Sequence, residues 1–91
     1  MIINYMASLD IFDKGNGNYL FTARGCPLKY FVIWAEGDKP RWERVDSGYD
    51  NVYRLNYTLD SNTTYNFHVY NGRTSDDFRG KMTYTTDDDY Y

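Results

Sequence analysis

Two side chains in this sequence have the chemistry of a catalytic nucleophile and its base. Cys26 is the only cysteine and His68 the only histidine among the 91 residues. A thiol paired with an imidazole can attack an electrophilic carbon, provided that the fold brings the two into hydrogen-bond contact. The alternative, which we favour, is that Cys26 is a buried or half-buried thiol and His68 a solvent-facing strand residue. A lone cysteine also excludes an intramolecular disulfide and a cysteine-based zinc site.

A second candidate for chemistry is the loop Asp13-Lys14-Gly15-Asn16-Gly17-Asn18, whose side-chain oxygens could bind calcium. It lacks the alternating series of oxygen ligands at the first, third and fifth positions, and no bidentate Glu follows at the right distance. A hairpin turn is therefore favoured. The acidic pair Asp76-Asp77 falls in a predicted turn, where solvation or turn capping explains it. With no phosphate loop and no Ser-His-Asp order, we expect no catalysis, no cofactor and no metal.

The charge balance narrows the possible partners. Ten Lys and Arg residues against 13 Asp and Glu residues give a net charge of −3. This is too weak for a DNA mimic, and a nucleic-acid binder would need a basic face. No apolar run approaches the ~20 residues of a membrane helix, and the first ten residues do not resemble a signal peptide. We therefore expect synthesis in the cytosol and neither nucleic acid nor membrane as a partner.

The elements that would position these residues are strands. Aromatic residues make up 20% of the chain, 11 of them Tyr, which suits a half-buried pleated surface. Runs with a two-residue period alternate with turn clusters, and Asn71-Gly72 and Gly15–Asn18 can supply the positive φ angles of tight turns. The pattern predicts one antiparallel seven-stranded β-sandwich over residues 1–86, followed by an acidic aromatic tail, 87–91. The strands are expected at 5–12, 18–23, 29–35, 41–46, 52–59, 63–70 and 78–86.

The stretch LDSNTTYNFHV, residues 59 to 69, resembles the E–F corner of fibronectin type III domains. The resemblance implies that Tyr65 fills the core with its ring while its hydroxyl bonds to backbone near Leu59. Phe67 and Val69 would then point inward as well, since side chains alternate along a strand.

The resemblance continues upstream. Tyr30-x-Val32-x-Trp34 is similar to the family's C strand and Arg41–Val45 to its C′ strand, whereas Phe21 stands where the family has a core Trp on strand B. It implies a fibronectin type III-like or immunoglobulin-like sandwich in which Tyr30, Val32 and Trp34 face the core. Such domains are usually spacers or binding modules and not enzymes.

If those three residues face the core, Phe31 and Ile33 must face outward. Strand F lies beside strand C in this architecture, so Phe31 and Ile33 could join outward residues of that strand in an aromatic patch. The alternative is that they only supply strand propensity. Trp and Arg dominate binding hot spots, and the acidic tail adds charge. The predicted partner-binding residues are Phe31, Ile33, Arg41, Trp42, Arg44, His68, Tyr70, Asp87, Asp88 and Asp89.

These expectations combine into a non-catalytic structural or binding module. An extracellular type of fold made without a signal peptide suits a component of a larger assembly, such as a phage virion decoration or tail protein. Its partners would be capsid or tail proteins, or copies of itself. One alternative is a small phage-type inhibitor that binds a host enzyme through the tail and loops. The other is a carbohydrate-binding module that stacks sugars on Trp42 and nearby Tyr rings.

Overall fold

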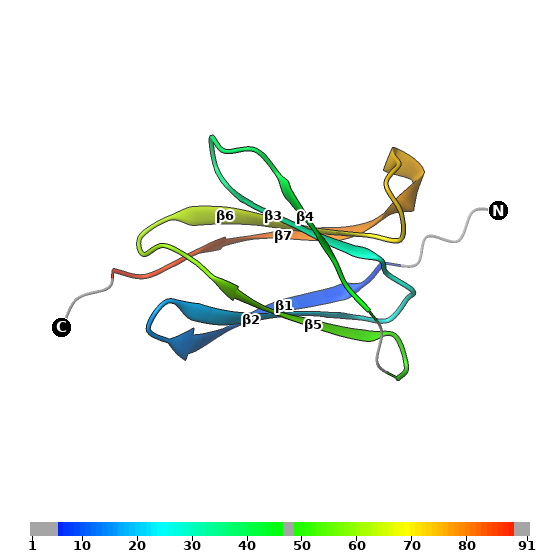
Figure 1. Ribbon diagram of the computed structural model, residues 1–91, viewed down its shortest axis with the longest axis horizontal. Helices are drawn as coiled ribbons and strands as arrows, with labels where there is room; N and C mark the ends of the chain where they lie inside the picture. The colour runs from blue at the N-terminus through cyan, green and yellow to red at the C-terminus, as the bar shows by residue number, and fades with distance from the viewer. Residues whose placement is uncertain (1–5, 47–48, 89–91) are drawn as a thin grey trace.

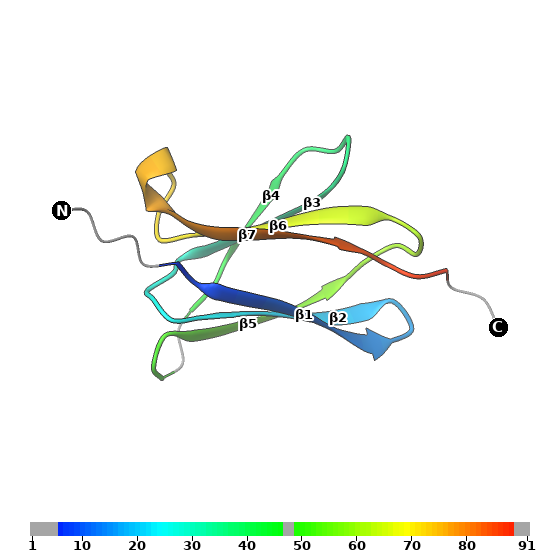
Figure 2. The same ribbon diagram turned by 180° about the vertical axis from the view of Figure 1, so that it is seen from behind.

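The computed structural model describes residues 6–46 and 49–88, and within them the chain folds into two antiparallel sheets (Figure 1). The three-stranded sheet has the order β1-β2-β5 and the four-stranded sheet the order β4-β3-β6-β7. Figures 1 and 2 show them as two layers packed face to face. The prediction of an all-β protein with seven strands in two antiparallel sheets is confirmed for this part of the chain. The strands are β1 (Ser8–Gly15), β2 (Asn18–Arg24), β3 (Tyr30–Ala35), β4 (Arg41–Arg44), β5 (Val52–Thr58), β6 (Thr64–Tyr70) and β7 (Phe78–Thr85).

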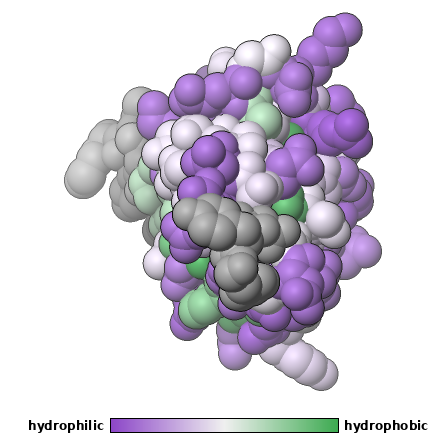
Figure 3. All heavy atoms as spheres, turned by 90° about the vertical axis from the view of Figure 1, so that its left-hand side faces the viewer, coloured by the Kyte–Doolittle hydropathy of each residue, from purple (hydrophilic) through white to green (hydrophobic). Residues whose placement is uncertain are grey.

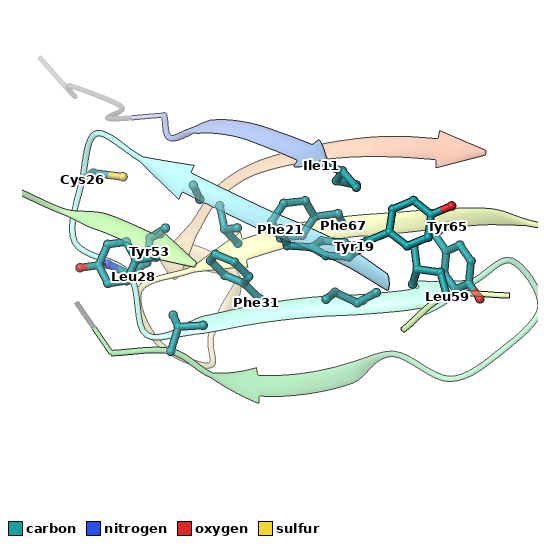
Figure 4. Close-up of a cluster of buried hydrophobic side chains, with 14 residues drawn as sticks. Ile11, Tyr19, Phe21, Cys26, Leu28, Phe31, Tyr53, Leu59, Tyr65 and Phe67 are labelled. Atoms are coloured by element: carbon teal, nitrogen blue, oxygen red, sulfur yellow. The ribbon is translucent and has the colours of Figure 1, made fainter. Parts of the chain in front are cut away.

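The core lies between the sheets and centres on three phenylalanines (Figure 4). Phe67 of β6 meets Phe21 of β2 and Phe31 of β3 edge to face, with ring centroids 4.9 Å apart in both pairs. All three rings are 0% exposed. Cys26 is buried at one end of this core, and burial raises the pKa of its thiol. The prediction of a buried or half-buried thiol is confirmed at this position.

The predicted orientation of β3 is wrong. Phe31 and Ile33 point into the core with exposed fractions of 0% and 1%, and Tyr30 and Trp34 lie on the outer side. The reason is the register against β6, which sets Phe31 opposite Val69 and Ile33 opposite Phe67. Directly paired residues share a face of the sheet, and Phe67 and Val69 are buried as expected. Every residue from 30 to 35 is apolar or aromatic, so alternation within β3 could not choose the face.

The corner at Tyr65 is confirmed. Its ring is buried beside Leu59, and its hydroxyl accepts a hydrogen bond of 2.9 Å from the backbone N–H of Asp60. Thr86 closes the same corner from the end of β7. Its hydroxyl donates to the carbonyl of Asp60 at 2.6 Å and accepts from the N–H of Thr63 at 3.0 Å. The corner is thus fixed by Tyr65 and Thr86, whose hydroxyls bind the backbone N–H and the backbone carbonyl of Asp60.

Replacing Tyr65 with Phe is expected to lower the free energy of unfolding by about 1 kcal/mol, because it removes the acceptor of the Asp60 N–H and leaves the ring in place. Urea denaturation of both proteins measures the change. Tyr49→Phe is the matched control, since Tyr49 is 93% exposed. Equal midpoints for the two variants would show that the corner hydrogen bond contributes nothing.

Two predicted turns had different outcomes. The hairpin between β1 and β2 is confirmed, with positive φ at Gly15, Asn16 and Gly17, and the Asp13 carboxylate accepts from the Gly15 N–H at 2.8 Å. At Asn71-Gly72 the prediction of positive φ is wrong. Residues 71–77 instead form a wider loop that ends in the 3-10 turn η1 (Ser75–Asp77), closed by Asn71 N–H to Asp77 C=O at 2.8 Å.

Candidate functional site

The outer side of the four-stranded sheet carries a continuous row of rings. Each of its strands contributes: Trp42 from β4, two rings from β3, two from β6 and Phe78 from β7. Successive ring centroids lie 4.8 to 5.6 Å apart. We call this surface the aromatic face. In order of contact, its members are Trp34, His68, Phe78, Tyr70, Trp42 and Tyr30.

Val32 forms the floor of the aromatic face. It pairs with Trp42 on one side and with His68 on the other. Its exposed fraction is 2%, although it is not part of the core between the sheets. The rings therefore cover an apolar side chain on the side of the sheet that faces solvent, where antiparallel sandwiches ordinarily place polar residues.

Two arginines lie over the rings at one end of the aromatic face. The Arg73 guanidinium is 4.8 Å from the Trp42 ring centroid and 5.2 Å from that of Tyr30, and the Arg44 guanidinium is 5.7 Å from Tyr30. These are cation–π distances. The rings and charges together form a surface with the residue types that are enriched at protein–protein interfaces.

The loop that carries Arg73 is held by its own hydrogen bonds. The Thr74 N–H and hydroxyl both donate to one oxygen of the Asp77 carboxylate, at 3.0 and 2.8 Å. These two bonds hold the pKa of Asp77 below its ordinary value. A Cβ at Gly72 would collide with that carboxylate and force it away from Thr74. The absence of a side chain at position 72 thus lets the loop fold back and set Arg73 over the rings.

Phe78 joins the aromatic face because of a bulge. Tyr70 pairs with Phe78 and Val69 with Gly80, so Arg79 is an extra residue in β7. If β7 alternated strictly from Phe78 onward, with no bulge, Phe78 would point inward together with Met82 and Tyr84. Gly80 provides the space for this irregularity, since a Cβ there would lie 2.9 Å from Leu9 Cδ1.

His68 lies between the Trp34 and Phe78 rings. Burial lowers the pKa of its imidazole, and the positive charge of Lys81 lowers it further. The folded protein therefore favours the neutral ring at neutral pH. Protonation would place a charge in a partly buried position and beside the positive charge of Lys81, and both oppose it.

Acidification is expected to destabilise the wild type more than His68→Phe. Because the folded-state pKa is lowered, the unfolded chain takes up the proton first as the pH falls through about 6.5, and unfolding becomes easier. The variant keeps a ring between Trp34 and Phe78 but has no titrating group. Melting temperatures from about pH 7.5 to about pH 5 measure the difference. If the melting temperatures of both proteins fell equally with pH, folding would not lower the pKa of His68.

Four of the predicted partner-binding residues meet on the aromatic face or at its edge: Trp42, Arg44, His68 and Tyr70. Phe31 and Ile33 do not, since both belong to the core. Arg41 pairs with Ile33 and lies near Tyr57, beside a hollow of about 440 Å³ between the sheet edges. Asp87 and Asp88 are exposed beyond the far end of β7, and Asp89 lies outside the described residues.

Sequence reasoning missed the other members of this surface. Tyr30, Val32 and Trp34 were assigned inward by the resemblance, and that assignment is overturned with the orientation of β3. For Phe78, the glycine at position 80 was an available signal, because an isolated glycine in a strand often marks a bulge. Nothing in the sequence indicated Arg73, whose position depends on the fold of the 71–77 loop.

The geometry also bears on the other candidate chemistry. Cys26 lies in the core between the sheets and His68 on the opposite side of the four-stranded sheet, so the fold does not pair them. Within residues 6–46 and 49–88, no three His, Cys, Asp or Glu side chains are grouped as they would be around a metal ion. The same ranges contain no helix with the length and apolarity needed to cross a membrane.

Comparison with protein-family models, with curated proteins and with solved structures found no match for this chain.

Proposed function

We propose that this protein is a non-catalytic binding module that docks a protein partner on its aromatic face, within a sandwich of the fibronectin type III-like or immunoglobulin-like kind. The order β4-β3-β6 supports this classification, since it is the C′–C–F order that the resemblance implies. The hydrogen bond from the Asp60 N–H to the Tyr65 hydroxyl supports it as well.

The observation that carries the proposal is the row of six rings over Val32 on a face that would otherwise be solvated. Half-buried Trp and Tyr rings lose little conformational entropy on binding, because their neighbours already restrict them. Burying them against a partner adds apolar contact area, and the arginines add directed hydrogen bonds. The surface is therefore suited to a partner that is itself flat and partly apolar.

A protein partner fits this surface better than a sugar. A sugar would stack on the flat side of an aromatic ring. At Trp42 and Tyr30 the Arg73 guanidinium already occupies that position. We place the module in a larger assembly such as a phage virion, as a decoration or tail component. The aromatic face is then the contact with a neighbouring subunit.

The test measures association with large particles in the protein's native source, by co-sedimentation of wild type and variants. Trp42→Ser is expected to weaken association by about 30-fold or more, the effect of losing one hot spot worth about 2 kcal/mol. Phe12→Ser is the matched control, because Phe12 is 50% exposed on the other sheet. Circular dichroism confirms that both variants fold.

Unchanged association of a folded Trp42→Ser variant would overturn the proposal. Recovery of a single host enzyme in place of particles would favour an inhibitor. Quenching of tryptophan fluorescence by a soluble glycan would favour carbohydrate binding.

A further inference from the structure

The aromatic face is positively charged within a negatively charged protein. By register, the outward positions of its four strands include Arg44 and Lys81 and no carboxylate. Arg73 adds a third positive charge from the neighbouring loop. The whole chain has a net charge of −3. The loop that carries Arg73 also contains Asp76 and Asp77, and the Asp77 carboxylate is engaged by Thr74. A partner for this face should carry carboxylates and, to match the rings, aromatic side chains.

One segment of this chain has that composition. Residues 87–91 read Asp-Asp-Asp-Tyr-Tyr, three carboxylates followed by two phenol rings. Carboxylates can accept bidentate hydrogen bonds from Arg44 and Arg73. Tyr rings can pack edge to face against Tyr70 and Phe78, which already meet each other in that geometry.

The segment leaves the sandwich from a fixed point. The Thr86 N–H donates to the Thr63 carbonyl at 2.9 Å, and the Asp87 carbonyl accepts from the Asn62 N–H at 3.0 Å. This point is the carboxyl end of β7, which lies at the opposite end of the molecule from η1 (Figure 1). Figure 3 looks at this end, where hydrophilic side chains predominate and hydrophobic ones are scattered.

The carboxylates of residues 87–89 cannot reach the arginines of their own aromatic face. Tyr30 pairs with both Arg44 and Tyr70, and Tyr70 with Phe78, so these residues lie level with the start of β7. From Thr86 back to that level β7 covers seven register steps, because Arg79 is the extra residue of the bulge, and these span about 23 Å at about 3.3 Å each. The three Asp residues that follow Thr86 cover about 10 Å when extended, so their carboxylates stop short of that level. Contact between this segment and the two arginines therefore requires two molecules.

We propose that residues 87–91 of one copy bind the arginine end of the aromatic face of a second copy. The inference rests on the proposed function and names its partner as another molecule of this chain. The point where the segment leaves the sandwich and the arginine end of the aromatic face lie at opposite ends of each molecule, so the contact is head to tail. It leaves one free surface at each end and can extend to a filament or close into a ring.

The experiment uses two full-length variants with complementary defects, examined by sedimentation velocity. Arg44→Glu/Arg73→Glu removes the acceptor surface, and Asp87→Asn/Asp88→Asn/Asp89→Asn removes the donor. Each alone should be monomeric at concentrations where the wild type forms oligomers. Their mixture should form 1:1 dimers and nothing larger, because only one junction can form. Raising the salt concentration should weaken association, since exposed charges are screened within about 8 to 10 Å.

The matched control is Arg24→Glu/Arg54→Glu, the same change of charge at exposed positions on the other sheet. It should oligomerise like the wild type. A monomeric mixture of the complementary variants, or a donor variant that still forms oligomers, would overturn the inference. The proposed function would still hold after such a result if Trp42→Ser weakens association with the large particles. Retained particle association by Trp42→Ser would instead overturn the proposed function.

Discussion

Replacing Phe31 with Ala is expected to lower the free energy of unfolding by about 3–5 kcal/mol, the usual cost of removing a buried aromatic ring. The Phe31 ring is 0% exposed and packs against Phe67, which in turn packs against Phe21. The cavity would therefore open at the junction of β2, β3 and β6. A domain of this size has about 5–15 kcal/mol of stability in total, so a large part would be lost. Urea denaturation with intrinsic fluorescence measures the change.

Phe12→Ala is the matched control, since Phe12 is half exposed on the edge strand β1. It removes the same ring and should change stability by about 0.5 kcal/mol or less. A small effect at Phe31 combined with weakened partner binding would contradict the inward orientation of β3. It would restore the orientation that the family resemblance implies.

Replacing Thr86 with Val is expected to cost about 2 kcal/mol. The side chain is 2% exposed, and its hydroxyl bonds to the Asp60 carbonyl and the Thr63 N–H. Valine has nearly the same shape but leaves both backbone groups without that partner. Each buried unsatisfied group costs about 1–3 kcal/mol. The loss should appear in equilibrium unfolding, together with faster amide exchange at Thr63.

The neighbouring substitution Thr85→Val is the control. Thr85 is exposed, and its hydroxyl bonds only to that of Thr64 at 2.8 Å, so both groups can turn to water. Its effect should stay within about 0.5 kcal/mol. Equal stabilities for the two variants would show that the Thr86 bonds do not hold the corner closed.

The sequence by itself determined the elements and the corner. Strand positions follow from runs with a two-residue period bounded by turn residues, and these signals are local. The β1–β2 hairpin was predictable because Gly15, Asn16 and Gly17 tolerate positive φ. Tyr65, Phe67 and Val69 were placed inward correctly. The family resemblance placed Tyr65 in the core, and alternation along β6 then placed Phe67 and Val69 on the same side.

Only the tertiary structure decided which residues form the aromatic face. In β3 both sides are apolar, so the pairing with β6 chose the core side, and that pairing joins residues distant in sequence. The outward turn of Phe78 depends on an extra residue in β7, and the place of Arg73 depends on a loop closed by Thr74 and Asp77. Local alternation fixes a face only where one side of a strand is polar. On this sheet both sides bury apolar groups, and long-range packing determines which rings are presented.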